Sequence, residues 1–282
     1  MLLEIAIADA YGSGFEFAPR AKIVRANDGV HYEAHEKGIP AGRYTDDTQM
    51  SVALAELLLA HDEPGAEACA DGFLAAYRRD PRAGYSEHFA AVLATAASGA
   101  ELRRRLAPGS RRNGAAMRSV PLALVADSAR LERIACTQAA VTHDSDPGRL
   151  SSVVVGLMGH ALLQQRAPIA DLPRIVHART GFMLRSDWRD EVACDAIETL
   201  HAVNTALQRH RSMSALLRDC IEFGGDVDSV AAIALGLASL TPEVMPDLPQ
   251  ALHDGLEDGP FGRTWLRALD VRLAERFGSP VR

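Results

Sequence analysis

The sequence predicts an all-α fold, a single compact multi-helix bundle, and three observations favour it. Hydrophobic residues make up 48% of the 282 residues and aromatic residues only 5%, an Ala- and Leu-rich balance that favours helices over sheets. Apolar residues recur at three- and four-residue steps along most of the chain, and the alternation of a half-buried strand is scarce. No break is long or polar enough to be a linker, so we expect residues 1–282 to form one domain.

The helical period predicts the elements in chain order, and glycines and prolines separate them. The predicted helices are residues 1–12, 48–61, 66–79, 86–98, 115–128, 130–142, 148–165, 190–209, 212–222, 228–240 and 262–276. The interruptions fall at Pro81, Pro108-Gly109, Pro147-Gly148, Gly224-Gly225 and the Pro-rich stretch 242–249. Residues 18–44 are the one extended irregular stretch, and loops of that length in compact domains often serve as lids or binding loops.

Composition excludes several classes of function and favours a cytoplasmic protein. The net charge of −7 argues against direct nucleic-acid binding, and the arginines between residues 103 and 112 are more typical of a solvated helix end. The four cysteines form no CxxC pair, so a disulfide framework or zinc knuckle is not expected and a reducing compartment fits best. The N-terminal stretch lacks a basic region and is interrupted by Asp9, unlike a signal peptide, and no apolar run reaches the length of a membrane span.

Two helix starts repeat one acidic design. Thr45-Asp46-Asp47-Thr48 opens one very apolar predicted helix, and Asp226-Val227-Asp228-Ser229, after a glycine pair, opens another. Helix capping and the helix dipole explain either one alone. Together they place four carboxylates at the ends of helices that belong in the core, so we expect these ends to converge. Such carboxylates repel unless cations neutralise them, and oxygen ligands without His or Cys favour Mg²⁺ or Mn²⁺.

With these motifs in view, the sequence resembles the ADP-ribosylglycohydrolase superfamily, which includes the dinitrogenase-reductase-activating glycohydrolase and the ADP-ribosyl-acceptor hydrolases. The matching motifs follow the family's order across most of the chain. They are Ile5–Gly12 followed by Glu16, Tyr44–Thr48, Asn113–Arg118, Thr142-His143, and Gly224–Ser229. Because the motifs occur in order, the resemblance is far more specific than any one of them.

The resemblance implies an all-α fold of the ADP-ribosylglycohydrolase type with two Mg²⁺ ions, or Mn²⁺, between the two acidic helix starts. The implied metal ligands are Thr45, Asp46, Asp47, Asp226, Asp228 and Ser229. Glu16 resembles the glutamate that family members carry on a mobile flap near the metals, where it would hold the resting site or act on water.

The implied reaction breaks the glycosidic bond at the ribose anomeric carbon, through an oxocarbenium-like transition state. We expect the four aspartates to bind metal, with any of them able to act as base, and Glu16 to transfer a proton or gate the site. Asn113, Gly114 and Ala115 would hold the diphosphate through backbone N–H groups, although an ordinary Asn-Gly turn is the common alternative. Gly84-Tyr85-Ser86 would add a second loop. His143 would contact ribose or phosphate, although a lone histidine is usually structural.

Departures from the family pattern bear on substrate identity. Ala8 stands where Gly is usual and Ser229 where Thr is usual, and both changes are mild. Ser110-Arg111-Arg112 stands where an aromatic residue and a glycine often precede the Asn-Gly, and residues 84–88 differ from the Gly-rich loop expected there. Arg111 would stack on adenine or pair with phosphate in their place, unless both arginines are surface residues.

The leading interpretation is a metal-dependent hydrolase that removes ADP-ribose from an ADP-ribosylated protein or small molecule. Arginine-linked ADP-ribose is slightly favoured because it is common among bacterial members, and serine-linked and O-acetyl conjugates stay open. A non-catalytic ADP-ribose-binding relative is the first alternative, but such relatives typically lose metal-binding acids that this chain keeps. A toxin-immunity protein of the same fold and a generic Mg²⁺ phosphohydrolase are further alternatives.

Overall fold

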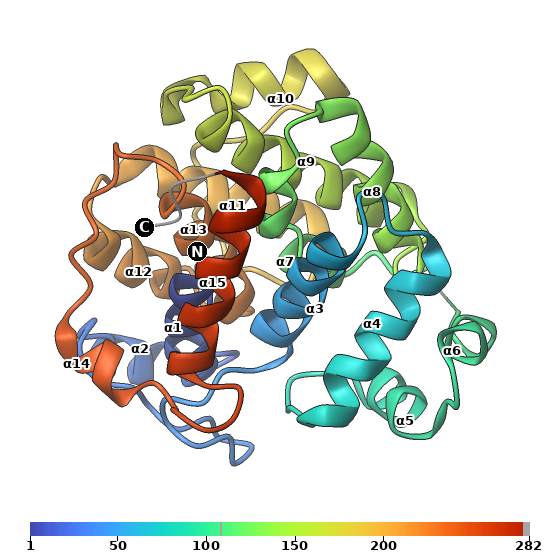
Figure 1. Cartoon of the computed structure of the whole chain (residues 1–282). Coiled ribbons are helices and arrows are strands. Elements are labelled where there is room, and N and C mark those ends of the chain that lie inside the picture. The colour runs from blue at the N-terminus through green and yellow to red at the C-terminus, as the bar shows by residue number, and fades with distance from the viewer. Residues whose placement is uncertain (108, 279–282) are drawn as a thin grey trace.

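The structure of the protein is a computed structural model that describes residues 1–107 and 109–278. Helices form nearly all of its regular structure (Figure 1), which confirms the predicted all-α class. In the described residues, extended segments pair only through isolated bridges such as Gly109 with His143 and Val192 with Gly225. Pro108, expected to interrupt the chain together with Gly109, lies outside the described residues, as does the predicted domain's C-terminal end at 279–282.

The helices follow one another with short connections. In chain order they are α1 (Leu2–Ser13), α2 (Arg20–Ala26), α3 (Asp46–Ala60), α4 (Ala66–Arg79), α5 (Glu87–Thr95), α6 (Gly99–Arg105), α7 (Gly114–Met117), the 3₁₀ helix η1 (Val120–Leu124), α8 (Ser128–Ala140), α9 (Asp146–Leu163), η2 (Ile169–Asp171), α10 (Leu172–Thr180), α11 (Ala196–Arg209), α12 (Met213–Glu222), α13 (Val227–Ala238), α14 (Gln250–Gly255) and α15 (Arg263–Phe277).

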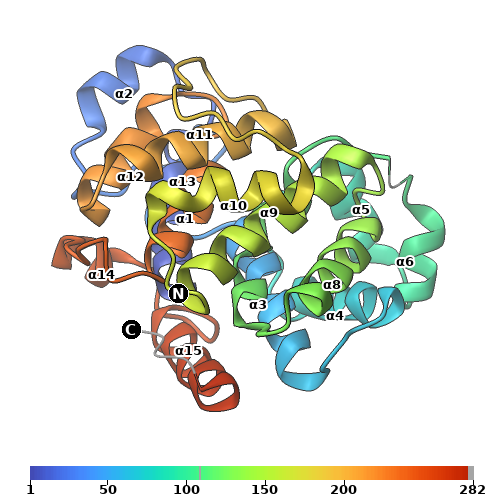
Figure 2. The ribbon, with the colours of Figure 1, turned by 90° about the horizontal axis from the view of Figure 1, so that it is seen from above.

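Two helices, α1 and α13, form the centre of the molecule. Every residue of α13 and nearly every residue of α1 is buried, as expected for helices that are apolar on all sides. They pack against each other so closely that a Cβ at Gly12 would lie 2.5 Å from the Cα of Asp228. Around them, α3 and α15 pack on α1, and α11 and α12 pack on α13. Figures 1 and 2 show α4, α5 and α6 gathered on one side of this centre and α2 and α12 on the other.

Most predicted helices are confirmed, with shifted ends, but two predictions are wrong in detail. The segment 115–128 is not one helix, because α7 ends at Met117 and η1 follows; Pro121, which lacks an N–H group, lies inside η1. The helix predicted from residue 190 begins only at Ala196. Its N-cap, Asp195, accepts hydrogen bonds from the N–H groups of Ile197 and Glu198, at 2.9 and 3.3 Å.

Four helices were not predicted. The segment 86–98 ends as α5 at Thr95, and a separate helix, α6, begins after Ser98, whose side chain accepts from the N–H of Glu101. The short helices α2, α10 and α14 lie in stretches that carry too few apolar residues for a clear period. Among the described helices, none combines the length and the apolar character needed to cross a bilayer.

Candidate active site

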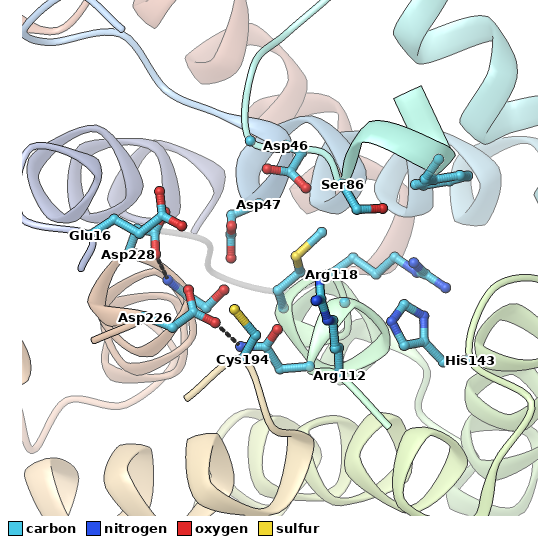
Figure 3. Close-up of a pocket in the computed structure, with 16 residues that line it drawn as sticks. Glu16, Asp46, Asp47, Ser86, Arg112, Arg118, His143, Cys194, Asp226 and Asp228 are labelled. Carbon is cyan, nitrogen blue, oxygen red and sulfur yellow. Dashed lines mark hydrogen bonds between the residues drawn. The ribbon is translucent and has the colours of Figure 1, made fainter. Parts of the chain in front are cut away.

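A pocket opens where the first turns of α3 and α13 meet the C-terminal end of α1 (Figure 3). Asp46 and Asp47 reach it from α3, and Asp226 and Asp228 reach it from the start of α13. Glu16 follows α1 and lies on the same side as Asp226 and Asp228. The structure therefore brings together the two acidic helix starts that the sequence pattern singled out.

The start of α3 is held by Asp9, a buried residue of α1. The carboxylate of Asp9 accepts the backbone N–H groups of Thr45 and Thr48, both at 2.9 Å, and their hydroxyl groups at 2.7 and 2.6 Å. Asp9 thereby caps α3 from a neighbouring helix. The side chain of Thr45, the N-cap residue, makes no capping hydrogen bond of its own. Because Thr45 and Thr48 turn toward Asp9, the side chains between them, Asp46 and Asp47, are left to face the pocket.

The start of α13 depends on the glycine pair before it. Gly224 and Gly225 have φ values of +76° and +82°, and a Cβ at Gly225 would lie 2.0 Å from the carbonyl oxygen of Val192. The Asp226 N–H donates to that same oxygen at 2.8 Å. The Asn113 amide group donates to the Asp226 carboxylate at 2.7 Å, so Asn113 orients an acidic side chain as well as lining the pocket.

In the part of the chain that the structure describes, the carboxylates on the acidic side of the pocket lie close together without a compensating positive charge. Burial first, and then the neighbouring carboxylates, raise the pKa values of Asp46, Asp47 and Asp228 well above the ordinary value. Burial, followed by the charge of Asp226, raises the pKa of Glu16 to about 7. The Oδ1 atom of Asp47 is buried without a hydrogen-bond partner among the described residues.

These carboxylates have the composition of a hard-cation site. One oxygen from each of Glu16, Asp226 and Asp228 lies within 4.8 Å of the others. Oxygen donors without imidazole or thiolate are the set that Mg²⁺ and Mn²⁺ prefer. A divalent cation would supply the partner that Asp47 Oδ1 lacks and would relieve the repulsion among the acids, so the residues fit the expected metals.

A loop before α5 closes the pocket next to Asp46. Gly84 has φ +105°, and a Cβ there would lie 1.8 Å from Asp46 Oδ1, so only glycine lets the loop pass this closely. Tyr85 does not line the pocket; its hydroxyl donates to Gln49 at 2.8 Å beneath it. Ser86 and Phe89 line the pocket in its place.

The opposite side of the pocket carries cationic and N–H donor groups (Figure 3). Arg118 is 1% exposed and donates to the side chain and carbonyl group of Gln138 and, at 2.9 Å, to the Thr142 hydroxyl. In the described part of the chain no carboxylate pairs with Arg118 or with Arg112. Burial lowers the pKa of Arg118 to about 10, so it remains a cation at neutral pH.

His143 stands beside these arginines as a neutral donor. Burial, followed by the charges of Arg118 and Arg112, lowers the pKa of His143 to about 3. Its Nδ1 atom lies 2.7 Å from the Thr142 hydroxyl oxygen, which already accepts from Arg118 and therefore has its proton available for Nδ1. That assignment leaves the ring proton on Nε2. Gly114 makes room for the ring, because a Cβ there would lie 2.6 Å from His143 Cε1.

The pocket contains most of the predicted site residues but not all of them. Those that line it are Glu16, Asp46, Asp47, Gly84, Asn113, Gly114, His143, Asp226, Asp228 and Ser229. Thr45, Tyr85, Ala115 and Arg111 do not line it. Ala115 is fully buried, and its carbonyl accepts from Ser119 at 2.7 Å. Arg111 and Arg112 are both exposed, and of the two it is Arg112 that lines the pocket.

Several pocket residues were not identified as site residues from the sequence. They are Phe89, Arg112, Met117, Arg118 and Cys194, together with Asp9 behind the acids. Arg118 ends the Asn113–Arg118 motif, so its position after an apolar run was a usable signal. No sequence pattern marked Cys194, because it lies in the irregular segment before α11 and meets Asp226 only in the folded chain.

Comparisons with known proteins point to one family. A family model described as ADP-ribosylglycohydrolase matches residues 1–281. The chain is 26% identical over 286 aligned residues to the ADP-ribosyl-[dinitrogen reductase] glycohydrolase of Rhodospirillum rubrum, covering 96% of this chain and 89% of that protein. A solved structure described as an ADP-ribosylglycohydrolase-related protein complex shares the fold, with a TM-score of 0.74 and 24% identity over 98% of this chain and 95% of that one.

Proposed function

The chain belongs to the ADP-ribosylglycohydrolase family, and from that premise we propose that it is a hydrolase that releases ADP-ribose from a modified acceptor. The bond cleaved would be the one at the ribose anomeric carbon. The observation that carries the proposal is the division of the pocket into an acidic end, made of Glu16 and the four aspartates, and a cationic end, made of Arg112, Arg118 and His143. We use these two names below.

A conjugate of ADP-ribose has the matching polarity. Its scissile ribose is neutral and rich in hydroxyl groups, and its diphosphate is anionic. The ribose would lie at the acidic end. The diphosphate would lie at the cationic end, where Arg112 and the Nε2–H of His143 are free to donate to phosphate oxygens.

We propose that the acidic end holds two Mg²⁺ ions, or Mn²⁺, on Asp46, Asp47, Asp226 and Asp228, with the hydroxyl groups of Thr45 and Ser229 as further ligands. The partnerless Asp47 Oδ1 and the raised pKa values of Asp46, Asp47 and Asp228 support this proposal. When bound, the ions neutralise the carboxylates and supply Lewis acidity next to the anomeric carbon. As a ligand, Thr45 would bind the metal through the same hydroxyl oxygen whose proton it donates to Asp9.

Glu16 is the proposed proton carrier. Without metal, burial and the charge of Asp226 raise its pKa to about 7. Bound cations would lower that pKa, so in the metal-bound protein the carboxylate would take a proton from water. Asn113 keeps the neighbouring Asp226 carboxylate in place through its 2.7 Å hydrogen bond. His143 and Arg112 fix the diphosphate, which aligns the anomeric carbon with the acidic end.

We favour arginine-linked ADP-ribose as the substrate. The leaving guanidinium group is cationic, and it would depart beside the carboxylates of Glu16 and Asp228. The relative from Rhodospirillum rubrum is named for ADP-ribosyl-dinitrogen reductase, a protein-linked conjugate. Serine-linked and small-molecule conjugates are the other outcomes of the test.

The test compares two linkages in one assay. Arginine- and serine-ADP-ribosylated peptides are incubated with the protein, with Mg²⁺ and with a chelator, and released ADP-ribose is measured. Release from the arginine peptide that needs Mg²⁺ and is lost in Asp228→Asn is the expected result. Tight ADP-ribose binding without release from any conjugate would instead indicate a non-catalytic binding protein.

A further inference from the structure

The loop between α2 and α3 carries a tight turn at residues 35–39. The His35 N–H donates to the Ile39 carbonyl at 3.0 Å, and the Gly38 N–H donates to the His35 carbonyl at 2.9 Å. Gly38 has φ +89°, a conformation that favours glycine. Next to the turn, the Lys22 amino group bridges the carbonyl groups of Ala34 and Gly14, at 3.1 and 2.6 Å, and so ties this loop to the end of α1.

The turn fixes the proton of the His35 ring. The Lys37 N–H donates to His35 Nδ1 at 2.8 Å, so Nδ1 is an acceptor and the ring proton is on Nε2. His35 Nε2 lies 3.1 Å from Glu16 Oε2. The histidine is only 7% exposed, so its ring is held between a backbone donor and the Glu16 carboxylate.

Glu16 has little else to hold it. It lies in the turn that follows α1, and the next residue, Phe17, is in the left-handed region at φ +50°, with its N–H donating to Gly225 O at 2.8 Å. Among the described residues, His35 is the one basic side chain with a nitrogen within 4 Å of the Glu16 carboxylate, at 3.1 Å. The carboxylate is also within 4.8 Å of oxygens of Asp226 and Asp228. Without metal those acids repel it, and the contact with His35 opposes that repulsion.

We propose that His35 is a positioning residue that holds the Glu16 carboxylate against the acidic end of the pocket through its Nε2–H. The proposal rests on the proposed function, in which Glu16 carries a proton. His35 does not itself line the pocket. It acts through Glu16, and it makes the loop between α2 and α3 a support for the catalytic machinery.

Two substitutions separate this role from a purely structural one. Asparagine at position 35 places its amide near the position of Nδ1, where it accepts from the Lys37 N–H and keeps the turn, but it stops short of Glu16. Glutamine reaches the position of Nε2 and donates to Glu16. The matched control is His31→Asn, in the same loop, where an exposed histidine pairs at 2.7 Å with Asp28, away from the pocket.

The experiment measures kcat and KM for Mg²⁺-dependent ADP-ribose release, with the thermal midpoint of each variant. His35→Asn is expected to lower kcat about tenfold while KM changes less than about twofold, as for a lost hydrogen bond to a charged group. His35→Gln is expected to recover most of that loss, and His31→Asn to match the parent. A parent-like kcat in His35→Asn, or equal losses in the Asn and Gln variants, would overturn the proposal.

Crystal structures of the same variants decide the question without any turnover. In the parent and in His35→Gln the Glu16 carboxylate is expected beside Asp226 and Asp228, and in His35→Asn it is expected to turn away. An unmoved carboxylate in His35→Asn would overturn the positioning role. A parent protein that releases no ADP-ribose from any conjugate would refute the proposed function, while these structures would still test His35.

Discussion

The two ends of the pocket are built in different ways. The acidic end is made by the first turns of two core helices, and each turn is anchored by contacts behind the acids, from Asp9 in α1 and from Val192. The cationic end is assembled from separate segments: Arg112 precedes α7, Arg118 follows it, and His143 lies between α8 and α9. Each helix start of the acidic end is therefore a local sequence feature, whereas the residues of the cationic end share no local pattern and come together only in the folded chain.

The largest predicted effect removes one carboxylate from the acidic end. Asp228→Asn should lower metal-dependent ADP-ribose release by at least about a hundredfold, because a proposed metal ligand loses its charge. The same change should raise the thermal midpoint of the metal-free protein, since it removes one of several buried, mutually repelling carboxylates. Release assays and thermal scans in chelator check both parts. Unchanged turnover would place the metals elsewhere.

The next effect tests the anchor behind the acids. Asp9→Ala leaves the buried N–H groups of Thr45 and Thr48 without an acceptor, and it should lower the free energy of unfolding by about 3 kcal/mol. The control is Glu56→Ala in α3, the helix that Asp9 caps; it breaks a partly exposed ion pair with Arg79 and should cost less than about 1 kcal/mol. Urea unfolding measures both. Equal costs would mean that Asp9 does not hold α3.

A smaller effect is expected at the cationic end. Arg112→Ala should raise KM about tenfold with little change in kcat, because it removes a charge-assisted contact to the diphosphate. Arg111→Ala, which changes the exposed neighbour outside the pocket, should leave KM within about twofold of the parent. Steady-state kinetics on the arginine-linked peptide distinguishes the two. An equal rise in both variants would point to general surface charge.

The smallest effect is on stability as a function of pH. The folded-state pKa of Glu16 is raised from 4.5 to about 7, and those of Asp46, Asp47 and Asp228 are raised from 3.8. Groups raised in this way contribute stability that is present below pH 4 and is lost as the pH rises through their folded pKa values. The buried His143, with its pKa lowered from 6.5 to about 3, acts in the opposite sense over the same range.

Comparing the parent with Asp228→Asn isolates the carboxylate contribution to this pH dependence. In metal-free buffer, the thermal midpoint of the parent relative to that of the variant should fall as the pH rises above 3.8, the ordinary pKa of an aspartate, and saturating Mg²⁺ should reduce that fall. Parallel curves of thermal midpoint against pH for the two metal-free proteins would show that folding does not raise the pKa of Asp228.

The sequence predicted the acidic end of the pocket better than the cationic end. The apolar period located the core helices, and the two acidic starts located Asp46, Asp47, Asp226 and Asp228, because acids at the start of an apolar helix are visible in the local sequence. Arg111 was the residue singled out as a substitute for the missing aromatic, and the pocket contains Arg112, because an irregular segment has no period that fixes which side chain points inward.

Other residues depended on tertiary contacts that no local pattern encodes. Asp9 caps a helix that begins 37 residues later in the chain, and His35 reaches Glu16 across the loop that was expected to be irregular. The long stretch 18–44 was noted as a candidate lid or binding loop, and none of its residues lines the pocket. The helix α2 inside it was missed because its single buried residue, Ile23, gives no period.

The most direct test of the central claim adds Mg²⁺ to a single sample that was first kept free of metal. The protein is given an arginine-ADP-ribosylated peptide in chelator, Mg²⁺ is then added in excess, and free ADP-ribose is followed over time. The account predicts no release before the addition and steady release after it, with the peptide returned unmodified. Equal release before and after the addition would contradict the metal-dependent acidic end, and no release at either stage would contradict the hydrolase itself.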